Sequence, residues 1–285
     1  MSYLNKIKAV SYAGKPKSNT AMFLSAKAGK LLTHLKDVNN CLIFAEHGLE
    51  VPDDLLQKHH FEFSSNPQLA YFEFTKELVA ENNKTNKNRK YSTLENGSII
   101  GENVRIGDNV TIEPFVFIEH DCSIGSNSFI GSGSVIKRTK IADYVHIAEN
   151  AVIGADGFNL VRVDDNLVNL PTLGKVIISQ GAYIGSNTVV SAGLAGETRI
   201  LEYAQIDADC HIHHDCQLDK NTTICSNVTM GGFVHIGEDS FIGIGAQIKN
   251  RITIGKNTII GMGSVVIRNV EDNKTVYGNP AKIGN

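Results

Sequence analysis

The chain has 285 residues, of which 42% are apolar and 20% are charged, as in an ordinary globular protein. Its formal net charge of -3 gives no reason to expect a nucleic acid or an anionic membrane surface as a partner. No stretch approaches the roughly 20 apolar residues that span a bilayer, and the N-terminus lacks the apolar core of a secretion signal, so we expect a cytoplasmic protein. The five cysteines show neither a CxxC nor a Cys/His cluster with zinc-ligand spacing, which predicts free thiols.

Residues 1–80 carry no short repeat, and they predict a small α/β domain. The segment 39–48, NNCLIFAEHG, is typical of a buried strand that ends in a turn. The segment 66–82 predicts a helix, because Asn66 can cap its first turn. Residues 81–97 begin with a polar run and are expected to form a linker.

From residue 98 onward, aliphatic residues recur at every sixth position. A period of six fits neither a helix nor an alternating strand, but it fits a short strand followed by a corner. Three such units close one coil, and coils stacked about 4.8 Å apart bury the aliphatic residues in a column. Residues 98–285 are therefore predicted to form a hexapeptide parallel β-helix. The longest unbroken run has twelve members: Ile200, Ile206, Ile212, Leu218, Ile224, Met230, Ile236, Ile242, Ile248, Ile254, Ile260 and Val266.

An insert at 154–176 interrupts the hexads. It contains a short alternating run and a turn at residues 164–166, which predicts a protruding hairpin loop. Loops on a rigid scaffold often carry function. A substrate loop and a flap that stabilises a trimer both remain open.

The tripeptide His-Asp-Cys occurs twice, beginning at His120 and at His214. A histidine beside a carboxylate can act as a general base. Eighteen residues after His214, and so one coil further on, comes Gly232, which lets a substrate approach the backbone and can donate its N–H to an oxyanion. Eighteen residues after His120 comes Arg138, which offers no such partner. This arithmetic favours the second tripeptide as the catalytic one.

The cysteines of both tripeptides and Cys210 fall four residues after an aliphatic hexad position. The small inward residue of the hexad belongs there. Cys122, Cys210 and Cys216 are therefore expected to pack in the core, as free cysteines usually do, and to be poor nucleophiles.

Three stretches resemble the UDP-3-O-acylglucosamine N-acyltransferases of lipid A biosynthesis. Two stretches match the family's motifs specifically: GADGFN…LPTLGKVIISQGAYIGSNTVV and AQIDADCHIHHDCQLDKNTTICSNVTMGG. The match is looser for the N-terminal stretch FLSAK…NPQLAYFEFTKEL. The final segment, with GNPAKIG, is similar instead to the sugar O- and N-acetyltransferases. The resemblance implies a left-handed β-helix and a homotrimer with active sites between subunits.

The resemblance also implies roles for the second tripeptide. His214 matches the family's general base, Asp215 is expected to orient or stabilise its imidazole, and Gly232 matches the glycine whose N–H stabilises the oxyanion. The reaction is acyl transfer from a thioester to a sugar amine. It needs no covalent enzyme intermediate, no metal and no permanently bound cofactor.

Two departures from the family shift the expected substrates. The family binds uracil through Phe, Asn and Tyr spaced three apart, where this chain has Phe23, Ala26 and Gly29, so the nucleotide base stays open among UDP, dTDP and GDP. The family's C-terminal helical extension, which meets acyl carrier protein, has no counterpart, and Arg251 replaces a second histidine. We therefore expect acetyl-CoA or a short acyl-CoA as donor and a nucleotide-linked amino sugar, for a surface glycan such as an O-antigen, as acceptor.

Candidate ligand-binding residues follow from these expectations. Phe23 is the candidate for the nucleotide, and three loop residues are candidates for the acceptor sugar: Asp156, Phe158 and Asn159. Candidates for the coenzyme A phosphates are Lys249, Arg268 and Lys282.

Two alternatives remain. One is a lipid A N-acyltransferase that uses a hydroxyacyl chain on acyl carrier protein. The other is a non-catalytic trimeric scaffold or a metal-binding β-helix, for which the clustered histidines would supply ligands: His211, His213, His214 and His235.

Overall fold

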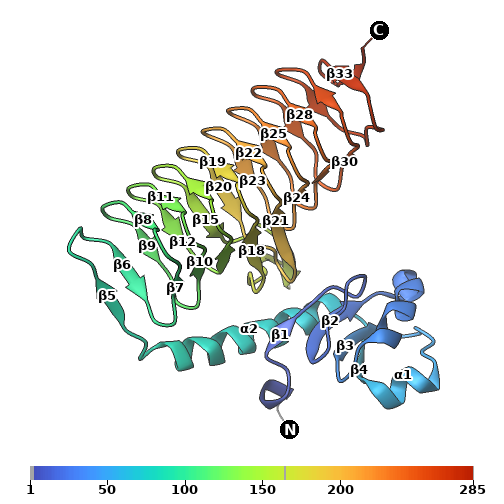
Figure 1. Ribbon diagram of the computed structural model, residues 1–285. Helices are drawn as coiled ribbons and strands as arrows, with labels where there is room; N and C mark the ends of the chain where they lie inside the picture. Colours follow the sequence, from blue (N-terminus) through green and yellow to red (C-terminus); the bar gives the residue numbers. More distant parts are fainter. Residues whose placement is uncertain (1–2, 164, 285) are drawn as a thin grey trace. The chain divides into compact units, whose positions relative to one another are not determined.

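The computed structural model describes residues 3–163 and 165–284 (Figure 1). The chain divides into two compact units. Unit 1 comprises Met1–Asn88, Phe158–Leu173 and Leu194–Gly196, and unit 2 comprises Arg89–Gly157, Gly174–Gly193 and Glu197–Asn285. No helix among the described residues combines the length and the apolar character that a bilayer crossing requires.

Unit 1 is built on a parallel sheet whose strands lie side by side in chain order. Its sheet strands are β1 (Ala9–Val10), β2 (Thr20–Leu24), β3 (Leu42–Glu46) and β4 (His60–Ser64). Its helices are α1 (Asp53–Lys58), α2 (Pro67–Asn86) and 3-10 turns at Tyr3–Asn5 and Ala26–Asp37. The strand expected within 39–48 is β3, whose residues Leu42–Ala45 are all buried.

Helix α2 begins where the sequence predicts and ends later. The Asn66 side chain accepts a hydrogen bond from the Leu69 N–H at 3.0 Å, which caps the first turn. The helix continues to Asn86, so the first six residues of the expected linker, 81–86, are helical. The polar run contains no Gly or Pro to stop the helix, and Lys84 pairs with Glu81 across one turn.

The insert at 154–176 contributes an antiparallel hairpin, β16 (Leu160–Val163) and β17 (Asn166–Asn169). The first residue of its expected turn, Asp164, lies outside the described residues. The hairpin does not stand free, because Val161 and Leu170 are buried against Phe72 of α2. The apolar positions of the insert therefore complete the core of unit 1.

Unit 2 is a parallel β-helix of three faces, seen in Figure 1 as a stack of coils that runs from β6 to β33. The first face consists of β7 (Arg105–Ile106), β10 (Ser123–Ile124), β13 (Thr139–Ile141), β18 (Lys175–Ile178), β21 (Glu197–Ile200), β24 (Gln217–Leu218), β27 (His235–Ile236) and β30 (Thr253–Ile254). The second face consists of β8 (Thr111–Ile112), β11 (Phe129–Ile130), β14 (His146–Ile147), β19 (Tyr183–Ile184), β22 (Gln205–Ile206), β25 (Thr223–Ile224), β28 (Phe241–Ile242), β31 (Ile259–Ile260), β33 (Thr275–Tyr277) and β34 (Lys282–Ile283). The third face consists of β5 (Tyr91–Thr93), β6 (Ile99–Gly101), β9 (Phe117–Ile118), β12 (Val135–Ile136), β15 (Val152–Ala155), β20 (Val189–Ser191), β23 (His211–Ile212), β26 (Thr229–Met230), β29 (Gln247–Ile248) and β32 (Val265–Val266).

The aliphatic hexad residues form the core of this β-helix. Successive coils pair in register, as Ile212 does with Met230 and Met230 with Ile248, so one aliphatic residue lies above the next. These side chains belong to a single buried cluster that runs from Val116 to Val276. The fold class that the sequence predicts, a hexapeptide β-helix with a small α/β domain, is confirmed.

Candidate functional site

Both His-Asp-Cys tripeptides lie on the same edge of the β-helix. His120 follows β9 and His214 follows β23, and both strands belong to the third face. We call this the histidine edge: the row of corner residues where the chain leaves the third face, directly after β6, β9, β12, β15, β20, β23, β26, β29 and β32. Since the tripeptides occupy equivalent corners, only their contacts can tell their roles apart.

The second tripeptide forms a buried His–Asp pair. The His214 Nδ1 atom lies 3.0 Å from Asp215 Oδ2, and the two side chains are only 10% and 5% exposed. Asp215 has a left-handed backbone, with φ of 60°, and its N–H donates to Thr198 Oγ1 at 2.8 Å. An ionised carboxylate can only accept a hydrogen bond, so the pair places the imidazole proton on Nδ1 and leaves Nε2 as the basic atom.

Gly232 lies one coil beyond His214, directly against its ring. A Cβ atom built on Gly232 would lie 2.4 Å from His214 Cε1 and 2.7 Å from Nε2, closer than any side chain tolerates. Glycine is therefore required for the imidazole to occupy this position.

The N–H of Gly232 is open to a ligand. At the same hexad position in other coils the N–H donates to a side chain, as Glu102 does to His120 Nδ1 at 2.7 Å and Lys256 to Asp272 Oδ1 at 2.8 Å. Within the described part of the chain, nothing accepts from the Gly232 N–H. A donor beside a basic nitrogen is the arrangement that stabilises an oxyanion during acyl transfer.

Two further histidines flank the pair. The His211 and His213 rings stack with centroids 4.0 Å apart. Burial, followed by the nearby His211 and His214, lowers the pKa of His213 to about 4, and burial also lowers the pKa of His211. The described residues contain no group of three or more His, Cys, Asp or Glu side chains that is placed to hold a metal ion, and His235 instead pairs with Asp219 on the first face at 2.8 Å.

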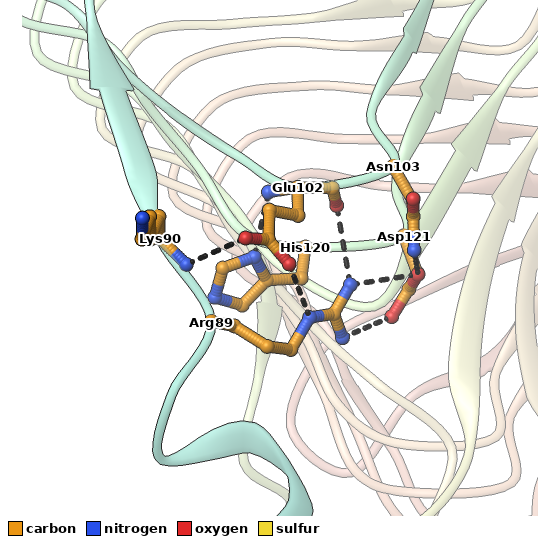
Figure 2. A network of polar contacts seen from close by, with 6 residues as sticks. All are labelled: Arg89, Lys90, Glu102, Asn103, His120 and Asp121. Atoms are coloured by element: carbon orange, nitrogen blue, oxygen red, sulfur yellow. Dashed lines mark hydrogen bonds and ion pairs between the residues drawn. The ribbon is translucent and has the colours of Figure 1, made fainter.

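The first tripeptide is engaged in holding the first coils together (Figure 2). His120 Nδ1 accepts from the Glu102 N–H at 2.7 Å, and the Tyr91 ring lies 4.4 Å from the imidazole. Asp121 receives two hydrogen bonds from Arg89, at 2.6 Å and 2.9 Å, which lower the pKa of its carboxyl. The groups that would do chemistry at this corner are therefore used in structural contacts.

The expected acceptor-binding residues are divided between the units. Asp156 lies on the histidine edge, in an ion pair with Arg138 at 2.6 Å. Phe158 is 67% exposed in unit 1, where the Asn159 N–H also donates to Asn169 Oδ1. Phe23, on β2, is 36% exposed and packs against Tyr71 with ring centroids 5.3 Å apart.

The three expected phosphate-binding cations are exposed. Lys249 and Arg268 follow β29 and β32 on the histidine edge, so they continue the row that holds His214 and Gly232. Lys282 lies apart from this row, in β34 on the second face.

Three cysteines of the β-helix are poorly placed to act as nucleophiles. Cys122, Cys210 and Cys216 are buried in the β-helix core. Burial raises the pKa of Cys210 to about 11 and that of Cys216 to about 12, so both stay protonated at neutral pH.

Two residues near the pair escape the sequence argument: Thr198 and Phe233. Thr198 stands seventeen residues before Asp215, one residue short of a full coil, so a search at coil spacing misses it. Phe233 contacts the His214 ring edge-on, with centroids 5.3 Å apart. Its signal in the sequence is an aromatic residue at a corner position that more often carries Asn or Asp.

The chain is similar in sequence to a hexapeptide-repeat model and to proteins named as acyltransferases. The bacterial transferase hexapeptide model, with six repeats, matches residues 103–138 and 233–268. The UDP-3-O-acylglucosamine N-acyltransferase of Caulobacter sp. (strain K31) is 33% identical over 142 residues, which are 50% of this chain and 42% of that protein. The enzyme of the same name from Herminiimonas arsenicoxydans is 30% identical over 43% of this chain and 35% of its own length. The chain thus matches less than half the length of these curated relatives.

Solved structures agree on the fold. The UDP-N-acetylglucosamine acyltransferase from Campylobacter jejuni superposes with a TM-score of 0.61 and 27% identity, over 68% of this chain and 74% of that one. An acyltransferase of the same substrate name from Bacteroides fragilis has a TM-score of 0.60 at 21% identity, over 66% and 72% of the two chains, and shows the fold alone.

These relatives correct one expectation. We expect from the sequence an acetyl or short acyl group delivered from coenzyme A, and this is wrong: the relatives are named for N-acylation of UDP-3-O-acylglucosamine, which matches the lipid A alternative. The chain is a hexapeptide-repeat β-helix protein that resembles the UDP-3-O-acylglucosamine N-acyltransferases.

Proposed function

We propose that this protein transfers a fatty acyl group from an acyl carrier protein thioester to the amine of a UDP-linked, 3-O-acylated glucosamine. The observation that carries the proposal is the buried His214–Asp215 pair, whose imidazole lies against Gly232. The acceptor comes from the names of the relatives, and the donor from the lipid A family that the sequence resembles.

The chemistry follows from the geometry of three groups. The acceptor amine attacks the thioester carbonyl, and His214 Nε2 removes a proton from the nitrogen as the C–N bond forms. The carbonyl oxygen becomes an oxyanion, to which the Gly232 N–H donates. When the C–S bond breaks, the imidazolium returns the proton to the leaving thiolate, so the enzyme ends in its starting state.

Asp215 supports both halves of this cycle. Its carboxylate holds the Nδ1 proton, which keeps the lone pair on Nε2 before attack. After proton transfer the same carboxylate lies 3.0 Å from a positively charged ring and stabilises it. The Thr198 hydroxyl, which accepts from the Asp215 N–H, fixes the left-handed corner from which the carboxylate reaches the ring.

The test is a thiol-release assay with acyl–acyl carrier protein. Wild type is compared with His214→Ala and with the matched variant His120→Ala, which changes the same tripeptide on the same edge. Acceptors are UDP-3-O-acylglucosamine and UDP-N-acetylglucosamine, which offer an amine and a hydroxyl. We expect turnover of the amine acceptor, a loss of at least about 10²-fold in His214→Ala, and retained turnover in folded His120→Ala.

Turnover of UDP-N-acetylglucosamine alone would show that the protein acylates a hydroxyl group and not an amine. No release from either acceptor by the wild type would reject the proposal. The proposal includes a homotrimer with the sites between copies, and light scattering on the purified protein measures its mass.

A further inference from the structure

The corners of the β-helix favour short polar side chains, and this makes two arginines stand out. Nineteen non-glycine residues in the described part of unit 2 have a left-handed backbone, and thirteen of them are Asn or Asp, which tolerate that conformation best. Arg138 and Arg251 share it, with φ of 50° and 62°. The partner of Arg138 is on the chain, because Asp156 lies 2.6 Å from its guanidinium.

Arg251 has no such partner among the residues that the structure describes. Its guanidinium carbon lies 4.4 Å from the centre of the Phe233 ring, in a cation–π contact. An electrostatic attraction of this kind restrains the guanidinium beside the ring. It leaves the five N–H donors of the guanidinium open to a ligand.

Phe233 links this cation to the proposed catalytic pair. Its ring centre lies 5.3 Å from that of His214, at an interplanar angle of 88°. The Arg251 N–H donates to the Gly232 carbonyl at 2.9 Å, so Arg251 stands one coil beyond the proposed oxyanion donor. Two ring contacts therefore connect the base to the guanidinium.

The charge along this part of the histidine edge has one sign. The corners 249–251 and 267–269 contain Lys249, Arg251 and Arg268 and no acidic residue. The whole chain, by contrast, carries a net charge of -3. A row of unpaired cations beside a general base attracts an anionic substrate.

We propose that Arg251, whose guanidinium lies over the Phe233 ring, binds a phosphate group of the substrate that reacts at His214. This inference rests on the proposed function for the identity of that substrate. A guanidinium binds phosphate through two parallel N–H donors, which a lysine cannot reproduce. Both substrates carry phosphate: the acceptor has a nucleotide diphosphate, and the donor has the phosphodiester of its phosphopantetheine arm.

The short link to His214 favours the diphosphate. In the acceptor the diphosphate is bonded to the sugar carbon next to the one that carries the amine. In the donor the whole pantetheine chain separates the phosphodiester from the thioester. Arg251 is linked to His214 through Phe233 alone, so a phosphate bound by Arg251 is better explained as the diphosphate of the nucleotide sugar.

Calorimetric titration tests this without requiring turnover. The ligands are UDP against uridine, and phosphopantetheine against pantetheine. The proteins are wild type, Arg251→Gln, Phe233→Leu and the control Lys256→Gln, which removes an exposed cation that pairs with Glu238 elsewhere. We expect Arg251→Gln to weaken UDP binding by about 10–100-fold and to leave uridine binding unchanged, with a smaller loss of UDP affinity in Phe233→Leu and none in Lys256→Gln.

Each other outcome has a defined meaning. A loss confined to phosphopantetheine keeps the phosphate site and assigns it to the donor. Unchanged binding of both phosphates by folded Arg251→Gln overturns the inference, even if the wild type is an active acyltransferase. A wild type that binds UDP through Arg251 but transfers no acyl group overturns the proposed function and leaves the phosphate site intact.

Discussion

Replacing Gly232 with alanine should move the His214 imidazole while keeping every proposed catalytic group. The new Cβ would lie 2.4 Å from His214 Cε1, so the ring must retreat by about 1 Å to reach an ordinary contact of roughly 3.5 Å. A misplacement of about 1 Å at a reacting group costs on the order of 10²-fold in rate. The alanine keeps its backbone N–H, so the proposed oxyanion donor survives. We therefore expect kcat to fall by about 10²-fold.

The fold should tolerate this change. The ring can leave its rotamer at a cost of about 0.5–1.5 kcal/mol, so the free energy of unfolding should change by no more than that. Thiol release measures kcat, and urea unfolding measures stability. The control is Gly14→Ala, whose Cβ meets only Leu31 Cδ2 at an ordinary 3.9 Å. Wild-type kcat in Gly232→Ala would refute the placement of the base against this glycine.

Three further predictions concern the same corner. Asp215→Asn should lower kcat by at least about 10²-fold with little change in KM, because the amide can donate to Nδ1 and so place the proton on the wrong nitrogen; a pH–rate profile identical to that of wild type would contradict this role. Thr198→Val removes the acceptor of the Asp215 N–H and should cost about 1–3 kcal/mol of unfolding free energy, measured in urea, together with a loss of kcat; an unchanged unfolding midpoint would show that the bond contributes nothing. The pKa of His213 in the folded protein is about 4, below its ordinary 6.5. Between these two pH values the folded protein therefore binds fewer protons than the unfolded chain. The stabilisation should be complete above pH 6.5 and should fall as the pH drops toward 4. His213→Gln should flatten that fall in urea titrations at pH 7, 5 and 4, and an equally steep fall would assign the effect to other groups.

The sequence predicts the β-helix well because its periodicity is a local property of the chain. Each hexad places one aliphatic residue inward, so the buried column from Ile200 to Val266 can be identified by counting. The same counting brings Gly232 beside His214, since both lie in an unbroken run. It misses Thr198, because the N–H that this hydroxyl accepts from lies seventeen residues on, one residue short of a coil.

The remaining errors concern long-range contacts and chemistry. No local pattern shows that the insert packs against Phe72, because the two are separated by some ninety residues of chain. Coil counting favours the second tripeptide, but it does not show that His120 accepts a hydrogen bond from a backbone N–H on the preceding coil. The expectation of a coenzyme A donor is wrong because the acetyltransferase-like GNPAKIG segment is a weaker guide to the donor than the motifs around His214.

The three-part make-up of unit 1 has a consequence for how the protein is made. Its core includes Leu173 and Ala195, and the Ala195 N–H donates to Tyr12 Oη at 3.2 Å. Because synthesis starts at the N-terminus, the ribosome must make part of the β-helix before the core of unit 1 can be completed. The early nascent chain holds apolar groups, such as Phe72, whose partners do not yet exist. Unit 1 can therefore be completed only after the first half of unit 2 has been synthesised. A protein truncated after residue 88 should expose the core of unit 1 and aggregate.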